Sequence, residues 1–294
     1  MNNINFRKIK ILNDYKSLTG KKTIQFINYF TNKICNRKLH YVEIGVFRGN
    51  SIINNALNSS SKIRMIGIDN FSFFKNVGKN FKYVKNNLKK NKLKNVKILK
   101  IDFEKAFEYL LKKKIKIGVL YIDGPHDYRS QLISLEKYKK LLSINSVIIV
   151  DDANYYHVRK ATQDFLNNNL DFKLIYQKYS TKHIANSSSK EKEILKNNFL
   201  NGINIIINKK NKYFKNKEKK IKFQKNEIKL KKIFIDSHEI FRHYYAYNGK
   251  EIFDLIYDLK RKKINITSFN KQLKKINPPK YLKKQIKFKS QNLF

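Results

Sequence analysis

The chain has 294 residues, of which 41% are hydrophobic, enough to bury a sizeable core. Lys and Arg number 65 against 22 Asp and Glu, so the formal net charge is +43 and attraction to anionic partners is expected at low salt. A single cysteine excludes an intramolecular disulfide, and no apolar run approaches the ~20 residues of a membrane helix. The amino terminus also lacks a signal-peptide pattern, so we expect a soluble, cytoplasmic protein without a transmembrane segment.

The basic charge by itself is a weak indication of nucleic-acid binding. Lysine accompanies abundant Asn and Ile, and all three residues use A/T-rich codons, so genome base composition explains much of the excess. Arg, the better bidentate ligand of phosphate and guanine, is scarce. A basic nucleic-acid-binding protein is therefore kept as the alternative interpretation.

Strand and helix patterns alternate along the first two thirds of the chain. A helical segment is expected within residues 1–39, where Ile24, Ile27 and Phe30 recur at helical spacing. Five apolar runs then predict strands at His40–Ile44, Arg64–Ile68, Val96–Ile101, Ile117–Ile122 and Val147–Val150. Helices are expected at Ser51–Leu57, Phe81–Lys92, Glu104–Leu111, Ser130–Leu142 and Val158–Leu166. This alternation predicts a doubly wound parallel sheet with right-handed crossovers.

Two last strands are expected at Phe172–Tyr176 and Ile203–Ile207, separated by a polar segment that carries Ser187-Ser188-Ser189. Their spacing suits an antiparallel pair at one edge of the sheet. The predicted fold class is therefore α/β, with a mostly parallel, seven-stranded sheet over residues 40–208.

Beyond residue 208 the composition changes, and residues 209–294 are predicted to form a basic, mostly helical extension. Lysine dominates Lys209–Lys232, which indicates a linker. Aromatic residues return in Ile233–Arg261 and predict a small helical appendage. The last thirty residues, with Pro278-Pro279, are expected to be loosely ordered.

The run Glu43-Ile44-Gly45-Val46-Phe47-Arg48-Gly49-Asn50-Ser51 follows the first strand and opens the first helix after it. Gly45 allows a sharp turn, and Gly49 permits a close approach of the backbone to a ligand. The dinucleotide pattern G-x-G-x-x-G is not met, because Phe47 stands where the middle glycine belongs.

Acidic residues follow the next strands at the edge where open α/β sheets bind ligands. Asp69 ends the second strand, where a carboxylate would bind a ribose diol, and Asp102 ends the third, near an adenine amino group. Glu43 could face a ligand ammonium. These acids fit a ligand with adenine, ribose and a cationic amino-acid tail. Each Asp could instead cap the helix that follows it.

The later strands end in Tyr-Ile-Asp-Gly-Pro-His-Asp-Tyr (121–128) and Val-Ile-Ile-Val-Asp-Asp (147–152). With the glycine-bearing run, these motifs resemble the class I S-adenosylmethionine-dependent methyltransferases, in particular methyltransferase family 24, near the macrocin and catechol O-methyltransferases. The resemblance covers residues 40–170 and implies a Rossmann-like methyltransferase fold. It implies S-adenosylmethionine at Glu43, Gly45, Gly49, Asp69 and Asp102, with Phe47 and Ser51 in the same run.

In the metal-dependent relatives a divalent ion sits on acids that match Asp123, Asp151 and Asp152. Three carboxylates also suit Mg²⁺ on chemical grounds, since it prefers oxygen ligands. His126 has the unperturbed pKa of a general base, and His157 is a weaker candidate for that role. A backbone-bonded loop histidine and a helix-capping aspartate are the ordinary alternatives for His126 and for one of the paired acids.

The resemblance implies a metal-assisted O-methyltransferase that transfers a methyl group to a hydroxyl of a small acceptor. A sugar or glycoconjugate precursor is the first expectation for this acceptor. An RNA methyltransferase belongs with the nucleic-acid alternative. The sequence is compatible with a homo-oligomer.

Overall fold

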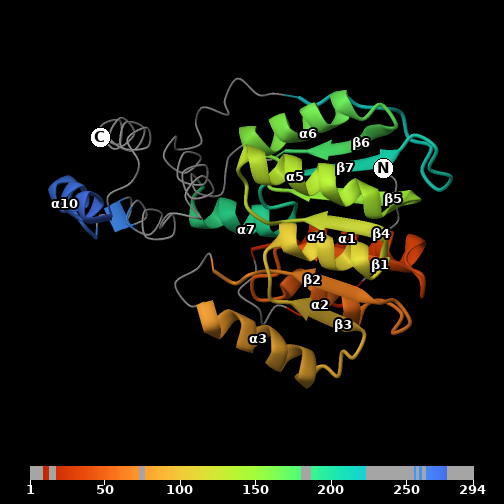
Figure 1. Ribbon diagram of the computed structural model, residues 1–294, viewed down its shortest axis with the longest axis horizontal. Coiled ribbons are helices and arrows are strands. Elements are labelled where there is room, and N and C mark those ends of the chain that lie inside the picture. The colour runs from red at the N-terminus through yellow and green to blue at the C-terminus, as the bar shows by residue number, and fades with distance from the viewer. Residues whose placement is uncertain are drawn as a thin grey trace.

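The computed structural model describes residues 9–12, 18–72, 77–179, 187–222, 255, 258–259 and 263–276. Their strands form one seven-stranded sheet in the order β3-β2-β1-β4-β5-β7-β6 (Figure 1). The strands are β1 (Leu39–Ile44), β2 (Met65–Ile68), β3 (Val96–Leu99), β4 (Lys116–Ile122), β5 (Leu142–Asp151), β6 (Phe172–Lys178) and β7 (Ile203–Asn208). Strands β1 to β5 pair in parallel, and β7 runs antiparallel to β5 and β6. The predicted fold class is confirmed.

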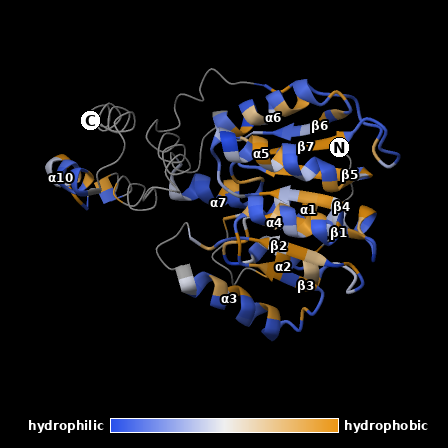
Figure 2. Ribbon diagram, in the orientation of Figure 1, coloured by the Kyte–Doolittle hydropathy of each residue, from blue (hydrophilic) through white to orange (hydrophobic). Residues whose placement is uncertain are grey.

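Helices cover both faces of this sheet. Those described are α1 (Lys21–Ile34), α2 (Asn50–Leu57), α3 (Val77–Lys90), α4 (Phe103–Lys112), α5 (Tyr128–Tyr138), the 3₁₀ helix η1 (Lys139–Leu141), α6 (Tyr156–Asn168), α7 (Ser189–Asn197) and α10 (Ile266–Ile276). Helices α1, α2 and α3 share one apolar cluster with the sheet, and α4, α5 and α6 share a second one. Figure 2 shows the hydrophobic strands between helices of mixed hydropathy. None of the described helices is long and apolar enough to cross a membrane.

The largest error in the predicted boundaries lies between α5 and β5. The sequence predicted a helix to Leu142 and a strand from Val147, but the helix ends at Tyr138 and β5 starts at Leu142. A short 3₁₀ turn joins them. Leu142 pairs with Ile117 of β4 and Val147 pairs with Val119, so residues 143–146 lie at an irregularity of this ladder.

Two helices form where the sequence did not predict them. Helix α7 follows the serine run, and its capping box explains its start: Ser188 Oγ accepts from the Glu191 amide while the Glu191 carboxylate accepts from the Ser188 amide. Helix α10 lies in the last thirty residues, which were expected to be loosely ordered. Its buried Phe269 and Leu273 stand four residues apart, the spacing of one helix face. The predicted appendage Ile233–Arg261 falls almost entirely outside the described residues.

The chain after β7 continues to pack on the sheet. Phe214 is buried, with its ring centroid 5.2 Å from that of Phe30 in α1. The Lys219 amide donates to the Leu174 carbonyl of β6 at 2.8 Å. We therefore propose that the domain extends to residue 222 at least, beyond the boundary placed at 208.

Replacing Phe214 by alanine should lower the free energy of unfolding by about 3–5 kcal/mol, because a buried aromatic ring leaves a cavity. Its neighbour Tyr213 is 52% exposed, so Tyr213→Ala is the matched control and should change stability by less than about 1 kcal/mol. Urea denaturation followed by circular dichroism measures both. Equal denaturation midpoints for the two variants would place the boundary before residue 214.

Candidate functional site

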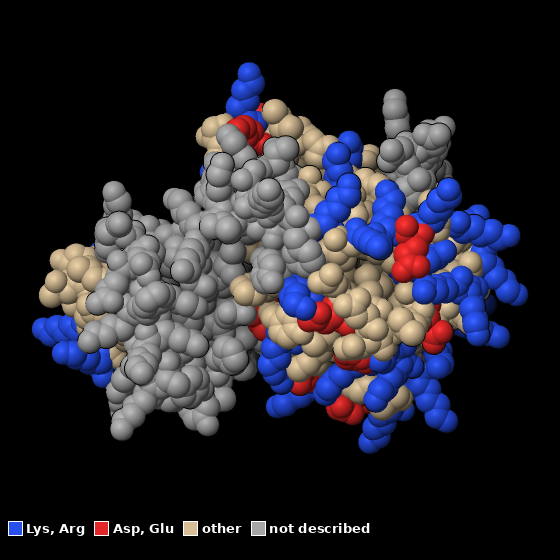
Figure 3. Space-filling view, turned by 90° about the horizontal axis from the view of Figure 1, so that it is seen from above, with Lys and Arg blue, Asp and Glu red and all other residues tan. Residues whose placement is uncertain are grey.

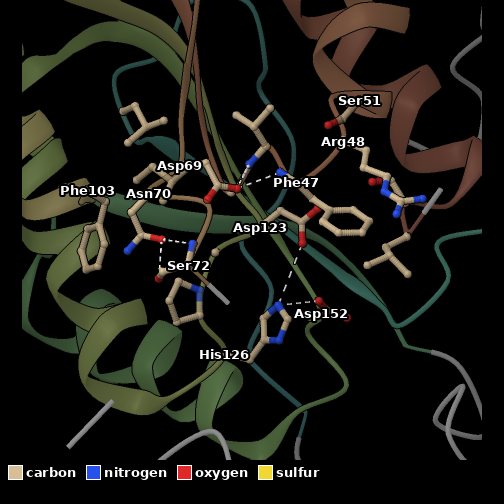
Figure 4. Close-up of a pocket in the computed structure, with 18 of the residues that line it drawn as sticks. Phe47, Arg48, Ser51, Asp69, Asn70, Ser72, Phe103, Asp123, His126 and Asp152 are labelled. Atoms are coloured by element: carbon tan, nitrogen blue, oxygen red, sulfur yellow. Dashed lines mark hydrogen bonds and ion pairs between the residues drawn. The ribbon is translucent and has the colours of Figure 1, made fainter. Parts of the chain in front are cut away.

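A pocket opens at the carboxyl edge of the sheet, beside the ends of β1, β2, β3 and β4. Of the predicted site residues it is lined by Gly45, Phe47, Ser51, Asp69, Asp102, Asp123, His126 and Asp152. Glu43, Gly49, Asp151 and His157 do not line it. Figure 4 shows Asp69 and Phe103 toward one end, Arg48 toward the other, and the Asp123, His126 and Asp152 side chains near one another.

The loop between β1 and α2 takes three left-handed conformations. Gly45, Phe47 and Gly49 have φ angles of 93°, 50° and 81°. A Cβ on Gly45 would lie 2.0 Å from the Asp123 carbonyl oxygen, so only glycine fits. Phe47 adopts the left-handed conformation at the position where a middle glycine was expected. This tight loop turns the chain across the floor of the pocket and starts α2.

Gly49 has a different role from the one predicted. A Cβ there would lie 3.0 Å from the Ile53 Cδ1 atom and 3.3 Å from the Val84 Cγ1 atom, in the packing between α2 and α3. The residue is buried and faces away from the pocket. Its glycine is explained by the positive φ and by helix packing rather than by approach to a ligand.

Asp69 holds this loop in place. Its Oδ2 accepts from the Val46 and Phe47 amides at 3.0 and 2.7 Å, and its Oδ1 accepts from the Phe71 amide at 2.6 Å. Burial raises the pKa of Asp69, and the backbone donors oppose that rise. Asp69, the residue predicted to bind a ribose, therefore lines the pocket and also holds the β1 to α2 loop in place.

Glu43 lies beneath the loop and is fully buried. It accepts from Tyr41 Oη at 2.5 Å and from Ser51 Oγ at 2.6 Å. Burial raises its pKa to about 8. Ser51 lines the pocket and Glu43 does not, so Glu43 is connected to the pocket through its hydrogen bond with Ser51.

Asp102 is a helix cap and also a residue of the pocket wall. It is the N-cap of α4, where its Oδ1 accepts from the Glu104 amide at 2.9 Å. It also lines the pocket, together with Phe103.

Asp123, His126 and Asp152 form the acid cluster of the pocket. The His126 Nε2 atom lies 2.6 Å from Asp152 Oδ2 and 3.9 Å from Asp123 Oδ1 (Figure 4). Ligand atoms of the three side chains all lie within 4.8 Å of one another. Asp123 follows β4 and Asp152 follows β5, two parallel neighbours, so the sheet itself brings the two loops together.

The charged groups of this cluster shift one another's pKa values. Burial and the Asp152 charge raise the pKa of Asp123 to about 6, although the hydrogen bond with His126 opposes the rise. Burial alone would lower the pKa of His126, but the carboxylates of Asp152 and Asp123 raise it to about 10. This raised pKa favours the protonated imidazolium of His126, whose charge offsets part of the charge of the two acids. In that state it cannot accept a proton.

Asp151 stands apart from the cluster. It is 4% exposed, and one of its oxygens accepts from Tyr121 Oη while the other accepts from the Asp152 amide at 3.0 Å. Tyr121 Oη also lies 3.0 Å from Asp123 Oδ2. Burial, followed by the charges of Asp123 and Asp152, raises the pKa of Asp151 well above its usual range. The structure therefore groups His126, rather than Asp151, with Asp123 and Asp152.

Sequence reasoning missed the residues that hold this cluster. Asn201, just before β7, donates from Nδ2 to Asp152 Oδ1 at 2.7 Å. The Tyr155 ring stacks on the His126 ring at 5.2 Å with an interplanar angle of 10°. Arg159 is fully buried and donates to the Ala153 carbonyl at 2.6 Å. Only the proximity of Tyr155 to the acidic motif could have marked it in the sequence.

Comparison with known proteins gives a family for part of the chain. Residues 42–153 match the model of methyltransferase family 24, which is described as a methyltransferase domain. This range runs from the first strand of the pocket to the loop that carries Asp152. No curated protein matches the chain.

Several solved structures match the chain at low sequence identity. The cofactor-bound Rv0187 protein from MTB is 13% identical, with a TM-score of 0.50 over 66% of this chain and 82% of that one. An O-methyltransferase from Bacillus cereus, in complex with SAH, is 14% identical with a TM-score of 0.48, over 67% and 84% of the two chains. TomG, an O-methyltransferase from Streptomyces achromogenes, is 13% identical with a TM-score of 0.48, over 64% and 79%.

The family match and the Rossmann-like sheet agree with the resemblance drawn from the motifs. Residues 42–153 therefore match a methyltransferase domain, and the sheet around them has the fold of a cofactor-bound protein of known structure.

Proposed function

We propose that the protein is an O-methyltransferase that uses a divalent cation to methylate a hydroxyl group of a small acceptor. The acid cluster beside the pocket carries this proposal, because it gathers two carboxylates and one imidazole where an acceptor would meet the cofactor. A cation bound there would lower the pKa of the acceptor hydroxyl and hold its oxygen near the methyl group.

The donor set fits a divalent cation. Asp123 and Asp152 supply hard oxygen ligands, and Asn201 already orients one of them. The imidazole of His126 widens the choice from Mg²⁺ to Mn²⁺ and other first-row ions, which accept nitrogen ligands more readily. A cation would also take over the role of the His126 proton in neutralising the two acids.

The part of the pocket outside the acid cluster fits the cofactor S-adenosylmethionine. Asp102 and Phe103 lie at the end of β3, where they would contact an adenine, and Asp69 lies at the end of β2, beside a ribose. Ser51 and the loop from Gly45 to Phe47 would contact the amino-acid tail. With the sulfonium methyl held over this loop, the chain needs only in-line geometry and a deprotonated acceptor for transfer.

The position of His126 is compatible with two alternative roles in this reaction. As a ligand it would hold the cation with Asp123 and Asp152, and the acceptor hydroxyl would lose its proton to solvent. As a base it would take the acceptor proton after its own proton has been displaced. His157 lies in α6 and does not line the pocket, so we assign it no part in the reaction.

A small acceptor is favoured over a nucleic acid. Figure 3 shows Lys and Arg spread over one face, with Asp and Glu among them, rather than gathered in one stripe. The pocket itself is lined by four acids, Asp69, Asp102, Asp123 and Asp152, which would repel a phosphate backbone. A sugar or glycoconjugate precursor remains the proposed acceptor, on the family resemblance, and a cytoplasmic location remains a prediction from composition.

Isothermal titration with S-adenosylmethionine tests the cofactor site. Asp69→Ala should weaken binding by about 10- to 100-fold, because it removes a charge-assisted hydrogen bond and frees the loop that it holds. Asp164→Ala is the control: it removes an acid that bonds Tyr128 and Lys160 outside the pocket. Equal affinities for both variants would show that the cofactor binds elsewhere.

Replacing Asn201 by alanine should lower Mn²⁺ affinity by about 10- to 100-fold, the usual effect of losing a partner that orients a ligand. Asn204→Ala is the control, since Asn204 is equally buried in β7 but bonds Tyr179 instead of the acids. Electron paramagnetic resonance of free Mn²⁺ gives both affinities. A similar affinity for the two variants would remove Asn201 from the site.

A further inference from the structure

Arg48 is the single Lys or Arg among the described residues that line the pocket, in a chain with 65 of them. Four aspartates line the same pocket. None of the ion pairs recorded among the described residues involves Arg48, and its nearest polar partner is the neutral Asn80. A permanent positive charge is thus held in an acidic pocket without a carboxylate partner in the described part of the chain.

The guanidinium is fixed in place. Its Nε donates to Asn80 Oδ1 at 3.1 Å, and Asn80 is 3% exposed in α3. Its carbon lies 5.3 Å from the centroid of the Phe47 ring and 5.7 Å from that of Tyr83. These contacts restrain the planar group, and one of its five N–H donors has a hydrogen-bond partner among the described residues.

We propose that Arg48 binds an anionic group, a carboxylate or a phosphate, of a molecule that occupies this pocket. A restrained guanidinium whose terminal donors have no hydrogen-bond partner among the described residues is suited to bidentate binding of a planar or tetrahedral anion. The four aspartates repel anions elsewhere in the pocket, so Arg48 would select where the anionic end of the ligand lies. Figure 4 shows Arg48 beyond the Phe47 ring, away from Asp69 and Phe103.

This inference rests on the proposed pocket, and the anion has two sources. One is the carboxylate of the methionine tail of the cofactor, at the end opposite its adenine. The other is an anionic substituent on the acceptor. The chemistry that Arg48 recognises is the same in both cases.

Paired variants and paired ligands separate the two sources. Isothermal titration compares S-adenosylmethionine with its decarboxylated form, which lacks only the carboxylate, on wild type, Arg48→Gln, Arg48→Lys and Arg37→Gln. Arg37 is an exposed arginine outside the pocket and controls for the loss of one charge. A second titration follows inorganic phosphate by ³¹P line broadening on each S-adenosylhomocysteine complex. Thermal unfolding confirms that the variants are folded.

If the cofactor carboxylate is the ligand, Arg48→Gln loses about 10- to 100-fold in affinity for S-adenosylmethionine and none for the decarboxylated form. Arg48→Lys recovers part of that loss. If the acceptor supplies the anion, S-adenosylmethionine affinity is unchanged and phosphate broadening disappears in Arg48→Gln alone. Equal loss for both nucleosides, or behaviour like Arg37→Gln in both titrations, overturns the inference. Failure of the wild type to bind S-adenosylmethionine contradicts the proposed function instead.

Discussion

Replacing Asp123 by alanine should lower the affinity for Mn²⁺ by more than about 100-fold. This loss is larger than the one expected for a residue that only orients a ligand, such as Asn201. The change removes one of the two carboxylates of the acid cluster and leaves the pocket walls in place. Asp102→Ala is the matched control, because it removes an acid of the same pocket that lies outside the cluster. Mn²⁺ binding of Asp123→Ala at the level of Asp102→Ala would defeat the metal proposal.

The same titration separates the two roles of His126. His126→Ala should lose Mn²⁺ affinity if His126 is a ligand. If it is only the base, Mn²⁺ affinity should persist, because removing the imidazolium leaves Asp123 and Asp152 with an uncompensated negative charge that attracts a cation. Asp151→Asn should change Mn²⁺ binding much less than Asp123→Ala, since Asp151 is outside the cluster.

Replacing Gly45 by alanine should destabilise the fold and remove both ligand sites at once. The Cβ would lie 2.0 Å from the Asp123 carbonyl oxygen, and φ is 93°, so the backbone between β1 and β4 must move. Left-handed strain alone costs about 1–3 kcal/mol, and the overlap adds to it. Because the displaced residue is Asp123 itself, affinities for S-adenosylmethionine and Mn²⁺ should fall together.

Gly78 provides the control for this substitution. A Cβ there meets nothing within 4 Å, and the residue lies in α3, so Gly78→Ala should raise stability by about 0.5–1 kcal/mol. Thermal unfolding and the two titrations report on both variants. A Gly45→Ala protein with normal stability and normal binding would show that the β1 to α2 loop can shift without affecting the pocket.

The regular part of the fold was predictable because its signals are local. Apolar strands that end in acid, separated by helices of ordinary length, gave the parallel sheet and the edge where Asp69, Asp102 and Asp123 gather. Antiparallel pairing of the last two strands was expected at an edge, but β7 inserts between β5 and β6. Spacing along the chain does not encode that order, which depends on which strand buries more apolar surface; β7 is buried along five of its six residues.

The sequence predicted which kinds of residue lie at the candidate site, but it did not predict which of them lie next to one another. Asp151 and Asp152 are adjacent in the sequence, yet a left-handed φ of 53° at Asp152 separates their side chains. One turns toward Tyr121 inside the sheet and the other toward His126 in the pocket. Such a change of direction depends on contacts from Asn201 and Gly202, which no local pattern around the acidic motif reveals.

The insertion of β7 also affects the order in which the protein can assemble. The last strand of the sheet in sequence is not an edge strand, so β6 cannot reach its final place before β7 enters the gap beside β5. The Ala153 and Asn154 amides bond the Gly202 and Asn201 carbonyls, and Asp152 bonds a residue 49 positions later. Pairings this distant form late in folding. A chain emerging from the ribosome would therefore complete its sheet and the loop that carries Asp152 in the same step, after residue 208 has been synthesised.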